Sequence, residues 1–138
     1  MSDRAEYVKQ VERWVSISSA VKVSDDDIYW LYPGVDLEQV AENWLAMGPE
    51  LVVVTFGEKG LTGYRKAEKV AVDAKRVVVA DTVGAGDTVG AILVEAIIED
   101  GLDKLTGERL SVMLDRAAKA AAITVARTGA LPPSKDEI

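Results

Sequence analysis

Residues 51–56 have the sequence LVVVTF, which places apolar side chains on both faces of an extended strand. A strand with two apolar faces is typical of a parallel sheet that helices cover on both sides. Other strand-like segments occur at residues 20–23 and 76–81, and segments with helical spacing of apolar residues lie between the strands. This alternation predicts an α/β fold with a layered, mainly parallel sheet and flanking helices.

Capping and turn residues predict where the other elements begin and end. Helices are expected at residues 4–17, 25–31, 37–47, 86–99 and 107–127. A small antiparallel hairpin is expected from residues 61–65 and 69–73. The chain has 138 residues, which is long enough for one domain and too short for two ordinary ones. We therefore predict a single domain over residues 1–138.

The composition excludes several kinds of chemistry. With no cysteine and no histidine, disulfides, thiolate or imidazole metal sites and Ser-His-Asp catalysis are all excluded. The net charge of −7 argues against nucleic acid or an anionic membrane as a partner. An anionic ligand such as ATP would need local attraction from backbone amides, a few lysines or arginines, or a metal. No segment has the apolar length of a membrane span or the pattern of a signal peptide, so we expect a cytoplasmic protein.

Residues 81–87, DTVGAGD, join the apolar run at 76–81 to an apolar helix and allow three interpretations. The simplest is a strand-to-helix turn, with Asp81 or Thr82 as the helix cap. Such a turn requires one glycine, whereas this stretch has three consecutive small residues at positions 84–86.

A dinucleotide-binding turn is the second interpretation, and it would use Gly84, Gly86 and Gly90. It would place Asp87 beside the pyrophosphate, so that like charges would meet at the start of the helix. Two helices also follow in succession here, where the dinucleotide motif has a helix and then a strand.

The third interpretation gives the carboxylate of Asp87 a chemical role. Gly84, Ala85 and Gly86 have almost no side chain, so their N–H groups can bind one oxyanion at a helix N-terminus. Asp87 can then accept a proton from a hydroxyl that is held against the same phosphate. A weak base is sufficient, because phosphoryl transfer depends more on positioning than on strong deprotonation. The pattern suits transfer of a phosphoryl group to an alcohol.

The stretch DTVGAGD resembles the C-terminal signature D-T-x-G-A-G-D of the ribokinase-like (PfkB-type) carbohydrate kinases. VKVSDDD, residues 21–27, is similar to the family's strand and acidic segment associated with metal and phosphate. VVVTFGEKG, residues 52–60, is similar to its nucleotide-binding strand and loop. AAAITVARTGALP, residues 120–132, is similar to its last helix and the turn near the adenine. The resemblance implies the C-terminal portion of a ribokinase-like fold, with ATP and Mg²⁺ as cofactors and a sugar as phosphoryl acceptor.

The resemblance also implies roles for individual residues. Asp87 corresponds to the catalytic base. The anion hole corresponds to Gly84, Ala85 and Gly86. Contacts to substrate and phosphate correspond to Asp81 and Thr82. Nucleotide contacts correspond to Thr55, Gly57, Gly60 and Lys119. Asp27 corresponds to the metal-associated acid, although the acidic run 25–27 is equally well explained as a solvated helix start.

Four positions depart from the family's usual pattern. Val89, Gly90 and Ile92 occupy positions where the family usually has Phe, a variable or polar residue, and Gly. Lys119 occupies a position where Asn is common. Ile92 affects the packing beneath the helix that starts with the glycines, and Lys119 affects the usual nucleotide contact. These departures are consistent with a diverged or partly disabled member.

The family's sugar-binding residues and lid lie mostly in an N-terminal half that this chain does not match. We therefore interpret the chain as a fragment or truncated form of a kinase that is inactive by itself. An uncovered sheet edge would favour self-association as a homodimer. The stretch KVSDDDIYWLYPG points towards the fructokinase-like branch. The alternative function is a non-catalytic nucleotide-binding or assembly module derived from a kinase half-domain.

Overall fold

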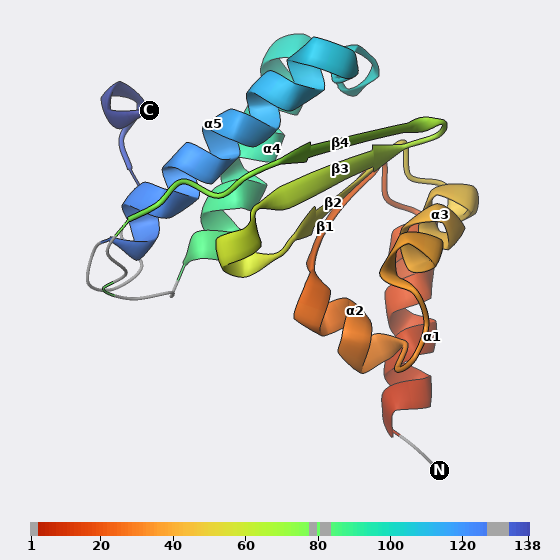
Figure 1. The fold of residues 1–138 in the computed structure, drawn as a ribbon. Coiled ribbons are helices and arrows are strands. Elements are labelled where there is room, and N and C mark those ends of the chain that lie inside the picture. The colour runs from red at the N-terminus through yellow and green to blue at the C-terminus, as the bar shows by residue number, and fades with distance from the viewer. Residues whose placement is uncertain (1–2, 78–79, 81–83, 127–132) are drawn as a thin grey trace.

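The computed structural model of this chain describes residues 3–77, 80, 84–126 and 133–138 (Figure 1). Its helices are α1 (Asp3–Ser16), α2 (Asp25–Leu31), α3 (Leu37–Met47), α4 (Ala85–Asp100) and α5 (Gly107–Val125). Its strands are β1 (Ala20–Ser24), β2 (Leu51–Thr55), β3 (Leu61–Arg65) and β4 (Glu68–Val72). Short 3₁₀ turns are η1 (Gly57–Lys59), η2 (Leu102–Lys104) and η3 (Lys135–Glu137). The α/β class and the predicted helices are confirmed.

The four strands form one mixed sheet in the order β1-β2-β3-β4. β1 and β2 are parallel, with Ala20 opposite Leu51, whereas the β2–β3 and β3–β4 pairs are antiparallel. The prediction of a mainly parallel sheet is therefore corrected. A parallel pair needs a long crossover connection, which α2 and α3 supply between β1 and β2. The short turn through η1 can only reverse the chain, so β3 joins β2 antiparallel.

The strand predicted at residues 76–81 is not observed in its described part. Arg76 and Val77 lie in no strand, and residues 78, 79 and 81 lie outside the described residues. Arg76 and Val77 pair with no described strand. The N–H of Ala80 instead donates to the carbonyl of Val125, 2.8 Å away at the end of α5.

The sheet separates two layers of helices. Figure 1 shows α1, α2 and α3 on one side of the strands and α4 and α5 on the other. β2 serves both layers: Leu51 and Val53 pack in the core beneath α4 and α5, and Val52 and Val54 pack in the core beneath α1–α3. All four side chains are fully buried, and each contributes about 1.5–3 kcal/mol by leaving water. This explains why residues 51–54 are apolar without alternation.

Local chemistry fixes the ends of several elements. Ser24 caps α2, because its hydroxyl accepts a hydrogen bond from the N–H of Asp27 at 3.1 Å. Gly60, which links η1 to β3, has a φ of +103°. A Cβ at this position would lie 2.1 Å from the carbonyl oxygen of Val72, so only glycine fits.

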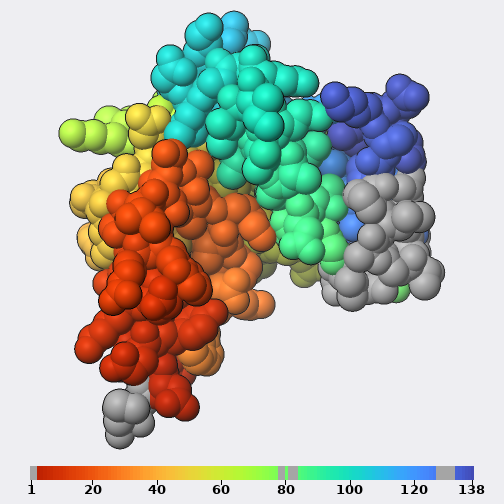
Figure 2. Space-filling model, turned by 180° about the vertical axis from the view of Figure 1, so that it is seen from behind, coloured from red at the N-terminus to blue at the C-terminus, as the bar shows by residue number. Residues whose placement is uncertain are grey.

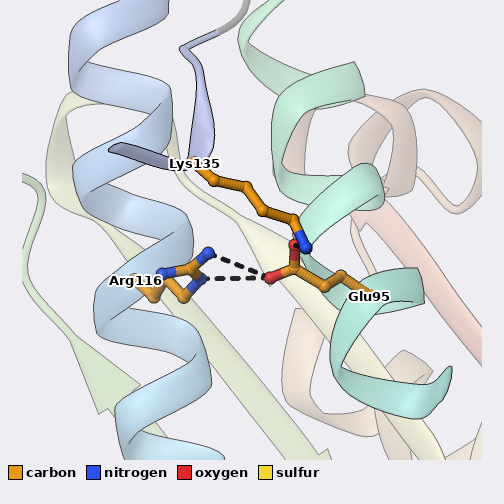
Figure 3. Close-up of polar contacts among 3 residues, drawn as sticks. All are labelled: Glu95, Arg116 and Lys135. Carbon is orange, nitrogen blue, oxygen red and sulfur yellow. Dashed lines mark hydrogen bonds and ion pairs between the residues drawn. The ribbon is translucent and has the colours of Figure 1, made fainter. Parts of the chain in front are cut away.

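The C-terminal turn is tied to the α4–α5 layer by one carboxylate. Glu95 on α4 receives the guanidinium of Arg116 from α5 at 3.0 Å and the ammonium of Lys135 from η3 at 3.8 Å (Figure 3). The Glu95 side chain is only 24% exposed, so this contact is less screened by water than an ordinary surface ion pair. It connects the last two helices with the C-terminal turn.

β1 pairs with β2 only, and no described strand pairs with its other edge. Beside this edge, α1, β1 and α2 border a depression of about 470 Å³, which we call the aromatic groove. Tyr7, Trp14 and Trp30 line it and are about half exposed, at 52%, 52% and 48%. In Figure 2, the red-to-orange residues of these elements lie next to the green residues of α4. No helix in the described part of the chain is long and apolar enough to cross a membrane.

Candidate active site

The predicted anion hole lies at the start of α4. Gly84 is the N-cap residue and has a left-handed backbone with φ of +87°, which glycine adopts without strain. Ala85 and Gly86 are already helical, so the N–H groups of this first turn have no carbonyl partner within the helix. We call residues 84–86 the anion turn. It presents backbone donors at the positive end of a 16-residue helix, which is the arrangement that binds oxyanions.

Asp87 follows the anion turn, in the first turn of α4, and its side chain is exposed. A carboxylate at this end of a helix is stabilised by the helix dipole. The exposed position leaves it accessible to a hydroxyl that approaches the anion turn. The predicted substrate contacts Asp81 and Thr82 lie outside the described residues.

Two buried threonines fasten the anion turn to α5. The Thr88 hydroxyl is 2.9 Å from the carbonyl oxygen of Gly84 and 2.9 Å from the hydroxyl of Thr124. The Thr124 hydroxyl is also 3.1 Å from the carbonyl oxygen of Ala120. Each hydroxyl carries one proton, so the pair can donate to only two of these three contacts at any moment. The result is a polar link between the start of α4 and the end of α5, within an apolar core.

A cleft of about 970 Å³ brings the predicted nucleotide residues to the anion turn. We call it the small-residue cleft. Thr55, Gly57 and Gly60 line one side, and Ala85 and Gly86 line another. Figure 1 shows why, because α4 begins and α5 ends at the same end of the molecule, beside the loop from β2 to β3. Segments that are far apart in sequence therefore share one opening.

The α5 wall of the cleft consists of small side chains. Ala118, Ala121 and Ala122 line it. Lys119, the fourth predicted nucleotide contact, is exposed and is not among the residues that line the cleft. The alanines leave a shallow apolar wall that suits a flat ring, whereas the Lys119 side chain extends from α5 into solvent.

Cationic side chains outnumber acidic ones around this cleft. Among the described lining residues, Lys59, Lys75 and Arg76 are cationic and Glu58 is acidic. Lys75 is already paired with Asp115 on α5, at 2.5 Å. Lys59 and Arg76 still outnumber Glu58 in this described lining, in a chain whose net charge is −7. This is the local attraction that an acidic protein needs to bind a phosphate-bearing ligand.

Sequence reasoning missed Lys22, which the fold brings to the anion turn from β1. A Cβ built on Gly86 would lie 3.0 Å from the ammonium nitrogen of Lys22. The available signal was a lysine within the otherwise apolar run 20–23. Its destination was not readable, because β1 and α4 are distant in sequence.

A complete protein site for a metal is not present among the described residues, since no three acidic side chains cluster. Mg²⁺ does not need one, because it keeps several waters and often binds one or two carboxylates together with phosphate oxygens. Asp27 is exposed, and its carboxylate makes no hydrogen bond to any described residue. It also borders the aromatic groove together with Lys22. A single available carboxylate at this position fits a phosphate-bound Mg²⁺.

The departures on α4 are accommodated by the fold. Val89 and Ile92 are buried in the core beneath α4 and α5, at 3% and 7% exposure. An added Cβ on Gly90 would meet no atom within 4 Å. The isoleucine is therefore part of the apolar core beneath α4 and α5.

The sequence matches the pfkB family of carbohydrate kinases over residues 1–137, and the chain belongs to this family. It is 37% identical to a fructokinase of Rhizobium leguminosarum bv. trifolii over 118 residues, which is 86% of this chain and 35% of the relative. It is 36% identical to fructokinase-2 of Zea mays over 115 residues, which is 81% of this chain and 34% of that protein.

Solved structures show the same fold. Fructokinase from Vibrio cholerae O395, in a fructose, ADP and calcium ion bound form, is 26% identical with a TM-score of 0.78, covering 91% of this chain and 41% of that one. Aminoimidazole riboside kinase from Salmonella enterica has a TM-score of 0.84 at 20% identity, covering 99% of this chain and 45% of that one. The chain thus spans less than half the length of each of these four proteins.

Proposed function

We propose that this chain is the nucleotide-binding and catalytic portion of a carbohydrate kinase that transfers a phosphoryl group from ATP to a sugar hydroxyl. The observation that carries the proposal is the small-residue cleft. It joins Thr55, Gly57 and Gly60 to Ala85 and Gly86 in one cavity, so a nucleotide bound by the first group can direct its terminal phosphate to the second. The Vibrio cholerae fructokinase, which is described with fructose and ADP, supports this choice of substrates.

The chemistry follows from the anion turn. Its N–H groups hold the transferred phosphoryl group and stabilise the charge on its oxygens. The Asp87 carboxylate accepts the proton of the sugar hydroxyl as that oxygen forms a bond to the γ-phosphorus. The bond from phosphorus to the β–γ bridging oxygen breaks, and its electron pair leaves with ADP. Asp87 can remain a weak base, because the proton is lost late in a loose transition state.

Mg²⁺ bound to the ATP phosphates would neutralise part of their charge during this transfer. We propose Asp27 as its protein contact, directly or through a water. Thr82 and Asp81 are proposed contacts for phosphate and sugar. For Lys119 we retain only a peripheral role near the adenine, since its side chain lies outside the cleft lining.

A second function, a non-catalytic nucleotide-binding or assembly module, is favoured by a different observation. The β1 edge and the aromatic groove have no cover among the described residues. The chain also spans only 35% of the Rhizobium relative. A module of this kind would keep the cleft and lack a sugar acceptor.

Two measurements separate the alternatives. Calorimetry on the 138-residue chain with ATP, ADP and adenosine tests the cleft, and we expect both nucleotides to bind. A chimera, in which this chain replaces its matching segment of the Rhizobium fructokinase, tests the chemistry with a panel of sugars. We expect sugar-dependent ADP release by the chimera and none by the chain alone. Nucleotide binding with an inactive but folded chimera would favour the non-catalytic module, and absence of nucleotide binding would overturn both.

A further inference from the structure

By alternation along β1, Lys22 lies on the sheet face that packs against α4 and α5. Alternation along β1 turns Val21 and Val23 towards the α1–α3 core and Ala20 towards the α4–α5 core. Lys22 shares the second face, directly opposite Val53 of β2, which is fully buried. A lysine stem can cover such a surface while its ammonium seeks a polar environment. The direction in which the Lys22 ammonium points therefore shows which polar environment it reaches.

The Lys22 ammonium points to the anion turn. Its nitrogen lies 3.0 Å from the position that a Cβ on Gly86 would occupy. This is the positive end of α4, so the placement of a cation here is electrostatically unfavourable in the absence of an anion. Lys22 forms no hydrogen bond or ion pair with any described residue.

The hydrogen-bond donors at this place also indicate an anionic ligand. An ammonium group has three donors and no acceptor, and the N–H groups of a first helical turn are also donors. These two sets cannot satisfy each other, although they converge on one place. A phosphate group offers several acceptor lone pairs and negative charge, so it can satisfy both sets at once.

We propose that the Lys22 ammonium binds the terminal phosphate of the nucleotide, together with the N–H groups of the anion turn. The proposal rests on the proposed function and adds a residue to it. It identifies one source of the local positive charge that a chain with net charge −7 requires. During transfer, Lys22 stabilises the charge on the moving phosphoryl group.

Protection of the free β1 edge is the competing explanation for this lysine. Edge strands often carry lysines that discourage pairing with other chains. A lysine in that role extends its charge into solvent at the open edge. Lys22 is only partly exposed, and its ammonium lies against α4 instead. The two roles predict different effects on ATP binding.

The test compares Lys22→Met with the wild-type chain by calorimetry with ATP, ADP and adenosine. We expect ATP affinity to fall by about ten-fold or more, as for loss of a charged hydrogen-bond partner. The loss should be smaller with ADP and absent with adenosine. Lys22→Arg should retain most of the ATP affinity, and Lys66→Met, in the exposed β3–β4 turn, should change nothing.

Thermal melting without nucleotide adds a second readout. Because Lys22→Met removes a cation from a positive helix end, the free protein should melt at the same or a higher temperature. Equal ATP affinity of wild type and Lys22→Met would overturn the proposal and leave the proposed function intact. An equal loss for ATP and adenosine would also overturn it, by indicating a structural role. If Lys22→Met does not fold, Lys22→Gln answers the same question. A wild-type chain that binds no ATP would remove the proposed function and this contact together.

Discussion

Two hollows of the described structure, the small-residue cleft and the aromatic groove, differ in almost every property. Glycines, alanines and cationic side chains line the small-residue cleft, and the chain itself supplies all of its described walls. The aromatic groove is lined by Tyr7, Trp14 and Trp30, and lies along a strand edge that nothing described covers. The cleft has the dimensions and charge for a small anionic ligand. The groove has half-exposed aromatic rings, which are typical of surfaces that bind another polypeptide.

Under the proposed function, this contrast separates the nucleotide side of the chain from the side that needs a partner. The described walls of the cleft come from β2, η1, β3, residues 74–77, α4 and α5. The aromatic groove, in contrast, leaves aromatic side chains half exposed, with no cover among the described residues. Substitutions of the aromatic side chains of the groove and substitutions at the anion turn should therefore affect different measurements. The following predictions are ordered by the size of the expected effect.

Asp87→Asn should have the largest effect. In the chimera, turnover should fall by roughly 10²–10⁴, the usual scale for loss of a general base. ATP affinity should stay within a few-fold, because the anion turn is unchanged. Asp100→Asn, in the last turn of the same helix, is the matched control and should leave turnover unaltered. Turnover near that of the parent chimera would remove Asp87 from the mechanism.

Gly86→Val should weaken ATP binding by the 138-residue chain by about ten-fold or more. Its Cβ would lie 3.0 Å from the Lys22 ammonium, and its methyl groups would obstruct the anion turn. Calorimetry measures the binding, and a thermal melt checks the fold. Gly90→Ala is the control: it has open space around the added Cβ and should raise stability by about 0.5–1 kcal/mol. Unimpaired ATP binding by Gly86→Val would mean that these amides do not hold the phosphate.

Trp14→Glu should shift the chain from dimer to monomer. We expect the free chain to self-associate through the aromatic groove and the β1 edge, where Trp14 is 52% exposed. Burying a charge at that contact should weaken dimerisation by about ten-fold or more. Light scattering over a concentration series measures this. Ile98→Glu, 78% exposed on α4 and away from the groove, should leave the association unchanged. A wild-type chain that stays monomeric at all concentrations would refute the expectation.

Tyr32→Phe should have the smallest effect, on stability alone. The Tyr32 hydroxyl donates to Glu12 at 3.0 Å and accepts from the indole N–H of Trp44 at 3.1 Å. Loss of these bonds should destabilise the fold by about 0.5–1.5 kcal/mol near neutral pH. Burial, opposed by the Trp44 hydrogen bond and aided by Glu12, raises the pKa of Tyr32 above its ordinary value of 10.0.

The sign of the pH dependence follows from this pKa. A raised folded-state pKa means that the fold favours the neutral phenol, so its contribution is complete below pH 10.0 and is lost as pH rises through the raised pKa. The stability difference between wild type and Tyr32→Phe, measured by urea unfolding, should therefore narrow at alkaline pH. ATP binding should not change. A stability difference between wild type and Tyr32→Phe that increases with pH would contradict the assigned role of Tyr32.

Much of the fold was predictable because its signals are local. Ser24 caps its own helix, and the pairs Pro33-Gly34 and Gly48-Pro49 follow the ends of α2 and α3. The mixed character of the sheet was not predictable in this way. Strand direction depends on which neighbour each strand pairs with, and a triple valine at 77–79 looks like a strand whether or not a partner exists.

In the candidate site, too, the residues that are contiguous in sequence were predictable and those brought together by the fold were not. The anion turn and Asp87 are contiguous, so their pattern is visible in the sequence. The role of Lys22 is not visible in the sequence, because it depends on the face of β1 from which the side chain projects and on where α4 begins. The Thr88–Thr124 link is hidden for the same reason, since it joins two helices through a contact of 2.9 Å.

The open edge of β1 also bears on the order in which the chain assembles. β2, β3 and β4 are joined by short turns, so their contacts are local and can form early. We expect β1 to pair with β2 later, because α2 and α3 lie between them in sequence, and among the described strands β1 pairs with β2 alone. We expect its amide hydrogens to exchange with solvent faster than those of β2, as mass spectrometry of deuterated peptides would show. If β1 opens, the edge of β2 can pair with β1 of another copy, so we expect slow strand exchange between copies at high concentration.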